Sequence, residues 1–99
     1  MTLEPDHLHI RVDRGYTRFL MGDVDAAMVD YDFALAQQPD HALARGYLGL
    51  AYQTQGRLDE ALVELRRSAE LTPSMLWQPP PVEEWIAECE RLIAERDGE

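Results

Sequence analysis

The chain has 99 residues, of which 45% are hydrophobic and 28% charged, a composition typical of one globular domain and unlike that of a disordered chain. Nine arginines and no lysine oppose nineteen acidic residues, which gives a formal net charge of −10. A surface of this sign repels nucleic acid and anionic lipid, so we expect neither as a partner and favour a protein or peptide with apolar or basic surface.

The start of the chain and its single cysteine indicate the compartment. Residues 1–7 form a short polar lead-in without the basic and long apolar segments of a signal peptide. Cys89 alone excludes an internal disulfide, and no apolar run approaches the about 18 residues that a membrane span requires. We expect a soluble cytoplasmic protein in which residues 1–99 form a single domain.

A first helix is predicted over residues 8–21. Its apolar residues recur every three or four positions and form one stripe: Leu8, Val12, Tyr16, Phe19 and Leu20. Arg11, Arg14 and Arg18 share a different face of the helix. In one interpretation the helix is a frayed or rotated end cap, whose arginines reach solvent or pair with Asp30 and Asp32. In the other, its apolar stripe is covered by a partner, which is a peptide or a second protomer.

A second helix is predicted over residues 24–37. Asp23 and Asp25 are expected to cap its start, because carboxylates there accept hydrogen bonds from free backbone N–H groups and meet the positive end of the helix dipole. Asp30 and Asp32 are expected to lie on its solvated flank. The segment lacks the glycine and terminal glutamate of an EF-hand loop, so we expect no calcium site here.

Two further helices are predicted over 41–55 and 58–71. Gly49 lies inside the first of them, where glycine costs about 1 kcal/mol relative to alanine, so a neighbouring backbone should come close at this point. Ala61, a small residue on the next helix, is the natural contact. Gly56 is placed to end the earlier helix in a left-handed conformation.

The chain repeats itself at one constant offset. The strongest correspondences are Gly15 with Gly49, Gly22 with Gly56, Ala27 with Ala61, and Pro39 with Pro73. The second copy carries, in order, Arg45, Leu48, Gly49, Tyr52, Ala61, Leu65 and Pro73. This pattern resembles the tetratricopeptide (TPR) repeat, a helix-turn-helix unit, with Arg45 standing where that family usually has tryptophan. The resemblance implies an all-α, right-handed helical-hairpin solenoid of about five helices, with repeats at 8–41 and 42–75.

The segment after the repeats is predicted to be a proline-rich connector at 76–81 and a capping helix at 82–96. We interpret the connector as a spacer that re-aims the chain, and a proline-rich recognition motif is the alternative. Trp85 and Cys89 lie on the apolar side of the helix, whose other side is acidic, as the end of a repeat array requires. Cys89 has no basic neighbour in this pattern, so we expect a small core residue and not a nucleophile.

By resemblance to TPR arrays, six residues line the concave groove: Val12, Tyr16, Phe19, Leu43, Tyr47 and Leu50. Gly46, which lies between them, is expected to leave room for an incoming chain. Each of the six can instead fill the interface between adjacent repeats, and the sequence leaves both alternatives open. Family members that hold acidic tails in this groove do so with lysines and asparagines, and the chain has neither. Acidic tails are therefore not expected in the groove.

No pattern in the sequence points to catalysis, a cofactor or a metal. His7, His9 and His41 have no cysteine or carboxylate that completes a ligand set, and no nucleophile-base pair or phosphate-binding loop is present. Our hypothesis is a non-enzymatic protein-protein interaction scaffold that binds an apolar or basic peptide or helix in its groove. The alternative is a self-assembling module, a homodimer or higher oligomer, whose groove is filled by another protomer, because repeat arrays usually need about three repeats.

Overall fold

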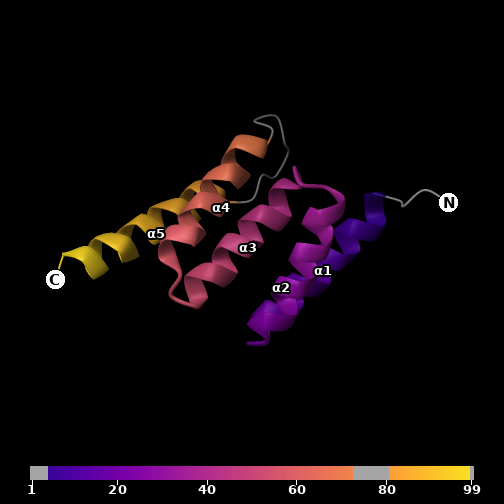
Figure 1. Cartoon of the computed structure of the whole chain (residues 1–99), viewed down its shortest axis with the longest axis horizontal. Helices are drawn as coiled ribbons and strands as arrows, with labels where there is room; N and C mark the ends of the chain where they lie inside the picture. The colour runs from indigo at the N-terminus through magenta and orange to yellow at the C-terminus, as the bar shows by residue number, and fades with distance from the viewer. Residues whose placement is uncertain (1–4, 73–80, 99) are drawn as a thin grey trace.

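A computed structural model describes residues 5–72 and 81–98. Within these ranges the chain forms five α-helices and no strand (Figure 1). Their bounds are α1 Pro5–Leu20, α2 Val24–Gln37, α3 Ala42–Thr54, α4 Leu58–Leu71 and α5 Val82–Asp97. The predicted helices are confirmed with small shifts at their ends. Apart from Pro81, the predicted connector at 76–81 lies outside the described residues.

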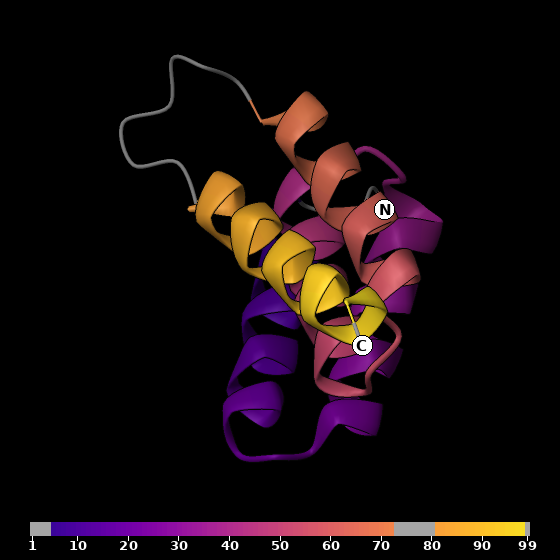
Figure 2. The same cartoon turned by 90° about the vertical axis from the view of Figure 1, so that its left-hand side faces the viewer.

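The helices stack side by side as a TPR-like solenoid. α1 pairs with α2 and α3 pairs with α4, and α3 also packs against α2 and touches α1. α5 repeats this arrangement one step further along, because it packs against α4 and touches α3 (Figures 1 and 2). The helix predicted as a cap therefore takes the position of the first helix of a further repeat, and α1, α3 and α5 are successive neighbours.

The turns within both hairpins end in the same way. Gly22 follows α1 and Gly56 follows α3, with φ angles of 90° and 80°, a left-handed conformation that glycine adopts without strain. The carboxylate of Asp23 then accepts a hydrogen bond from the backbone N–H of Ala26 at 3.3 Å, which confirms its predicted capping of α2.

A histidine caps α3. The Nδ1 atom of His41 accepts a hydrogen bond from the backbone N–H of Ala44 at 3.2 Å, and its ring stacks on that of His9 with the centroids 6.4 Å apart. Burial lowers the pKa of His41 below its ordinary value, and the neighbouring His9 lowers it further. Only a neutral imidazole offers an acceptor nitrogen, so this cap depends on an unprotonated His41.

The core lies in two clusters. The first joins the two hairpins and consists of Val12, Ala27, Tyr31, Ala34, Ala44, Leu48 and Ala51. Its four alanines let α2 and α3 approach closely. The second lies under α5 and consists of Leu58, Ala61, Leu65 and Cys89. Cys89 is fully buried, and its thiol donates to the carbonyl of Leu58 at 3.4 Å, which confirms it as a core residue.

Each hairpin is closest at a glycine. A Cβ atom added at Gly15 would lie 2.7 Å from the ring of Tyr31, and one added at Gly49 would lie 2.7 Å from the Cγ of Leu65. The Cβ atom added at Gly49 would also lie 3.1 Å from the carbonyl oxygen of Ala61, which agrees with the predicted contact between Gly49 and Ala61. These distances are shorter than van der Waals contact, so neither position has room for a side chain.

We predict that Gly49→Ala destabilises the fold. Forcing a methyl group against Leu65 costs about 1–3 kcal/mol by overpacking, and the better helix propensity of alanine offsets about 1 kcal/mol of this. The measurement is the free energy of unfolding by urea denaturation. Thr54→Ala, at an exposed position of the same helix, is the control and should be close to neutral. Equal stability of the Gly49 variant and the parent would contradict the close crossing.

We predict that acid weakens the His41 cap. The pKa of His41 is lowered on folding. The stabilisation that the cap gives to the fold is therefore complete above the ordinary pKa of 6.5 and is lost as the pH falls through the lowered pKa. His41→Asn keeps a neutral capping acceptor, so it should remove this part of the pH dependence. Thermal unfolding between about pH 8 and pH 5 measures it. His9→Gln retains the cap but removes the second cause of the lowered pKa, so the loss should remain and move to higher pH. Identical profiles for the parent and His41→Asn would refute the role of His41.

Candidate partner-binding surface

Four aromatic rings form a continuous row across α1, α3 and α5. We call Phe19, Tyr16, Tyr47 and Trp85 the aromatic row. The ring centroids of Phe19 and Tyr16 are 6.2 Å apart and those of Tyr16 and Tyr47 are 4.3 Å apart, both in stacked geometry. Tyr47 and Trp85 follow at 6.0 Å with tilted rings. All four side chains are half-buried, so the row offers aromatic surface to a partner.

The six predicted groove residues do not all lie at the surface. Tyr16, Phe19 and Tyr47 belong to the aromatic row, and Leu43 and Leu50 are half-buried on α3. Val12 is fully buried in the core cluster between the hairpins. This corrects its prediction as a groove residue, because a side chain with no exposed surface fills the interface between repeats.

The space next to Gly46 is occupied by the chain itself. A Cβ atom at Gly46 would lie 3.0 Å from the Trp85 ring and 3.0 Å from the hydroxyl of Ser68. The expectation that Gly46 leaves room for an incoming chain is therefore wrong, since α5 uses that room. The sequence predicts Trp85 on the apolar side of a capping helix but does not predict that Trp85 extends the aromatic row. The small residue Gly46 on α3 is the feature that could have indicated space for the tryptophan ring.

A buried tyrosine lies beneath the row. Tyr31 of α2 is fully buried, and its ring is 5.9 Å from that of Tyr47. Its hydroxyl has no hydrogen-bond partner among the described residues. Burial raises the pKa of the Tyr31 hydroxyl, and the nearby hydroxyls of Tyr47 and Tyr16 raise it further. Tyr31 is therefore neutral at physiological pH and serves as the floor of the row.

The surroundings of the aromatic row are acidic. Burial raises the pKa of Tyr47, and the charges of Tyr16 and Asp13 add to this effect, which places the Asp13 carboxylate near the row. On α5, Glu88 is exposed one turn after Trp85, where it also pairs with Arg91. A partner segment on this surface would meet aromatic rings bordered by negative charge.

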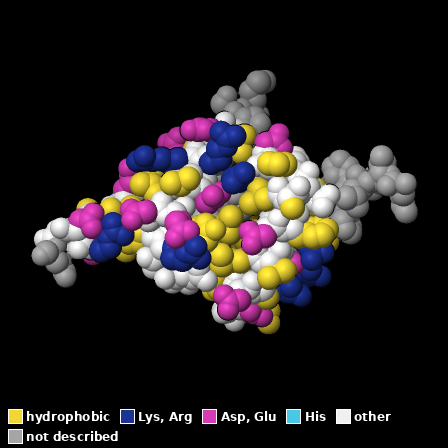
Figure 3. Space-filling model, in the orientation of Figure 1, with side chains coloured by type: hydrophobic (Ala, Val, Ile, Leu, Met, Phe, Trp, Pro, Cys, Tyr) yellow, Lys and Arg dark blue, Asp and Glu magenta, His cyan; other side chains and the backbone are white. Residues whose placement is uncertain are grey.

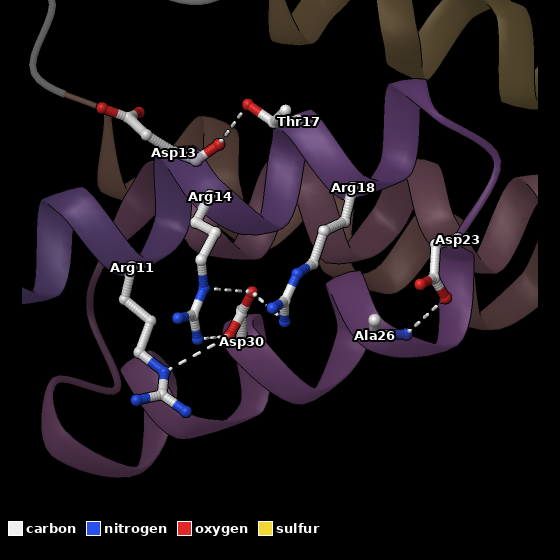
Figure 4. A network of polar contacts seen from close by, with 8 residues as sticks. All are labelled: Arg11, Asp13, Arg14, Thr17, Arg18, Asp23, Ala26 and Asp30. Carbon is white, nitrogen blue, oxygen red and sulfur yellow. Dashed lines mark hydrogen bonds and ion pairs between the residues drawn. The ribbon is translucent and has the colours of Figure 1, made fainter.

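On α1, the arginine face turns toward α2 and surrounds one carboxylate (Figure 4). The Nη2 of Arg14 donates to Asp30 at 2.6 Å, the Nη1 of Arg18 donates at 3.2 Å, and the Nε of Arg11 lies 3.3 Å from the same carboxylate. Asp30 is 0% exposed. The predicted pairing of the arginines is confirmed for Asp30 but not for Asp32, which forms no ion pair among the described residues. The prediction of a solvated flank is wrong for Asp30 and holds for the exposed Asp32.

The arginines decide the ionisation of Asp30. Burial by itself raises the pKa of this carboxyl, but the hydrogen bond from Arg14 and the charges of Arg14, Arg18 and Arg11 outweigh burial and leave the pKa lowered. Arg11 also lies over the ring of Phe33 at 3.9 Å, a cation-π contact. The first helix is therefore not rotated toward solvent, and its arginines occupy the side that faces the paired helix.

The second hairpin contains a simpler version of the same contact. In the register of the repeat, Glu64 corresponds to Asp30 and Arg45 corresponds to Arg11. The Nη1 of Arg45 donates to Glu64 at 2.9 Å. This recurrence of an acid-arginine pair is visible in the sequence and is the signal that could have indicated the burial of Asp30.

No catalytic arrangement emerges from the described residues. Among residues 5–72 and 81–98, no group of three or more histidine, cysteine, aspartate or glutamate side chains could hold a metal ion. Burial raises the pKa of the Cys89 thiol, and the charges of Asp59 and Glu90 raise it further, which disfavours the thiolate. None of the described helices is long and apolar enough to cross a bilayer.

Comparison with known families agrees with this geometry. A tetratricopeptide repeat family model matches residues 18–75, more than half of the chain and the part that contains α2, α3 and α4. The chain belongs to the tetratricopeptide repeat family. The match begins at Arg18, so Arg11 and Arg14 lie outside it. Among curated proteins, a search finds no match to the sequence. Tetratricopeptide repeats generally mediate protein-protein interactions, and that is the function class of this chain.

We predict that Asp30→Asn destabilises the repeat strongly, because it leaves three converging arginines without a counter-charge. Breaking a buried pair in this way costs about 3 kcal/mol. The pKa of Asp30 is below its ordinary value of 3.8. The contribution of its carboxylate to the free energy of unfolding is therefore present above pH 3.8 and is lost as the pH falls through the lowered pKa. Unfolding free energies at neutral pH measure the effect.

Asp32→Asn is the matched control. Burial and the charge of Glu64 raise the pKa of Asp32, so its ionised form is disfavoured in the folded chain, and its removal should be neutral or slightly stabilising. Equal losses from the two substitutions would show that the three arginines do not depend on Asp30.

Proposed function

We propose that this tetratricopeptide repeat protein is a non-enzymatic scaffold whose aromatic row binds an apolar segment carrying basic residues, in the groove expected along α1, α3 and α5. The observation that carries the proposal is the stack itself. Four half-buried rings from three helices are joined by centroid distances of 4.3 to 6.2 Å. Rings of this kind supply large contact area at low entropic cost, which is why tyrosine and tryptophan dominate binding hot spots.

Charge selects the class of partner. The chain carries a net charge of −10, Asp13 of α1 acts on Tyr47, and Glu88, which also pairs with Arg91, lies one turn from Trp85 on α5. Lysine or arginine residues flanking an apolar stripe would meet this negative border and would also stack on aromatic faces. An acidic segment would be repelled at the same place. The proposed ligand is therefore an amphipathic basic helix or extended peptide.

A scaffold fits the described side chains better than an enzyme does. The titratable groups with shifted pKa values are explained by structural contacts, such as the Asp30 cluster, the His41 cap and the tyrosines of the row. None of these supplies a nucleophile next to a base, which acid-base or covalent catalysis requires.

The test uses a synthetic amphipathic helix with leucine on one face and lysine beside it, and a matched peptide with glutamate in place of lysine. In a Trp77→Phe background, Trp85 is the remaining tryptophan, and its emission should change on titration with the lysine peptide. We predict that Tyr16→Ala weakens this binding about tenfold or more, as expected for an aromatic hot spot. Val63→Ala, on the exposed surface of α4, is the control and should bind as the parent does.

Two results would contradict the proposal. One is unchanged lysine-peptide affinity in Tyr16→Ala with helicity intact by circular dichroism. The other is light scattering that shows a homodimer which Tyr16→Ala dissociates. In that case the row is filled by a second copy, and the self-assembling module replaces the scaffold.

A further inference from the structure

The arginine cluster on α1 carries more positive charge than its buried acid requires. In the second hairpin Glu64 is paired with Arg45 alone, and the positions equivalent to Arg14 and Arg18 are Leu48 and Tyr52. One arginine per acid is thus sufficient for this hairpin pattern. The first hairpin places three arginines around one carboxylate, a local surplus of two positive charges in a strongly acidic chain.

Part of this cluster faces outward with N–H donors to spare. The side chains of Arg14 and Arg18 are 49% and 39% exposed. Toward Asp30, Arg14 uses Nε and Nη2 and Arg18 uses Nη1. Within the described residues, Nη1 of Arg14 and Nε and Nη2 of Arg18 make no hydrogen bond. A guanidinium in this state can pair with a further carboxylate in bidentate geometry.

Exposed apolar side chains accompany these arginines. Ile10 lies one turn before Arg14 on the same side of α1, and it is 66% exposed. Met21 lies in the turn that follows α1, three residues after Arg18, and it is 79% exposed. On α2, Val29 is 60% exposed next to Asp30 in the sequence. We call this surface the α1–α2 edge: Ile10, Arg14 and Arg18 of α1, Met21 in the turn after α1, and Val29 of α2. In Figure 3, one group of basic side chains lies at the end of the molecule where Figure 1 draws these helices.

The same side of α3 is a helix-packing surface. In the register of the repeat, Ala44 and Ala51 correspond to Ile10 and Thr17, and both alanines are fully buried against α2 in the first core cluster. In α1 the corresponding residues are exposed. On α1, Ile10 and Arg14 therefore hold the register positions at which α3, through Ala44 and Leu48, packs against the preceding hairpin. Met21 and Val29 lie outside that register, because their equivalents Gln55 and Val63 are exposed in the second hairpin as well.

We propose that the α1–α2 edge binds an acidic amphipathic helix of a partner protein. The carboxylates of that helix accept hydrogen bonds from Arg14 and Arg18, and its apolar residues cover Ile10, Met21 and Val29. The surplus charge selects an acidic ligand. The apolar neighbours select a protein segment over a small anion, which would gain nothing from them. This site is separate from the aromatic row and prefers the opposite charge, so it does not rest on the scaffold function proposed above.

The experiment uses the synthetic helix with leucine on one face and glutamate beside it, with the lysine version as its counterpart. Binding of the labelled peptide is followed by fluorescence anisotropy, and its position is mapped by amide chemical shifts. The test variant is Arg14→Leu with Arg18→Tyr, which copies Leu48 and Tyr52 of the second hairpin and keeps the Arg11–Asp30 pair. Arg66→Leu with Arg67→Tyr removes the same charge from exposed positions on α4 and is the matched control.

We expect the glutamate peptide to shift the amides of α1 and α2 and the Arg14/Arg18 variant to bind it about tenfold more weakly, with the α4 control unchanged. If the variant does not fold, Ile10→Ser with Met21→Ser tests the apolar half in the presence of all three arginines, and we expect weaker binding there too. Unchanged affinity in whichever of these variants folds would overturn the proposal. Displacement of the peptide by inorganic phosphate at equal concentration would also overturn it, because it would show a simple anion site.

Discussion

Close contact between paired helices at a glycine is the constraint on which the fold depends. Gly15 and Gly49 occupy the same position in the two hairpins, and a side chain at either would overlap the residue that faces it, Tyr31 or Leu65. Where two backbones come this close, every neighbouring position has a fixed partner. The acid-arginine contact therefore recurs one repeat later, and the alanines of α2 and α3 can close the space between the hairpins. The stacking of α1, α3 and α5, and with it the aromatic row, follows from that geometry.

The two hairpins reach the same packing with different chemistry. In the second, the positions equivalent to Arg14 and Arg18 are Leu48, which is buried, and Tyr52, which is half-buried, so Arg45 and Glu64 alone supply the acid-arginine contact. In the first, the corresponding residues are Arg14 and Arg18, which together with Arg11 share the one carboxylate of Asp30. Burial of an acid is unfavourable unless its charge is compensated, and here the arginines lower the pKa of Asp30 despite full burial. The arginines make the first hairpin dependent on charge, and they leave positive charge on α1 at positions where α3 has Leu48 and Tyr52.

Most of the fold could be predicted from the sequence because its signals are local. Helix periodicity, the glycines at the turns and the constant offset between the two copies each depend on residues close to one another or related by the repeat, and the five helices match them. What could not be predicted depends on contacts between elements. Val12 and Tyr16 lie on one stripe of α1, but only the placement of α3 decides that the first is buried and the second stacks on Tyr47. The space at Gly46 is likewise decided by α5, which places Trp85 against it.

Where α3 has Leu48 and Tyr52, α1 has Arg14 and Arg18, and these arginines also give the molecule two surfaces that differ in charge. On an acidic chain, the aromatic row has Asp13 and Glu88 near it, whereas the α1–α2 edge presents guanidinium groups with exposed aliphatic side chains. The two stripes of α1 that carry them point to different sides of one helix, so a ligand on either leaves the other accessible. With both proposed ligands bound, this short array would hold a basic and an acidic segment at once. The energetic link between them would pass through α1, whose position is fixed by Asp30 on one side and by Tyr47 on the other.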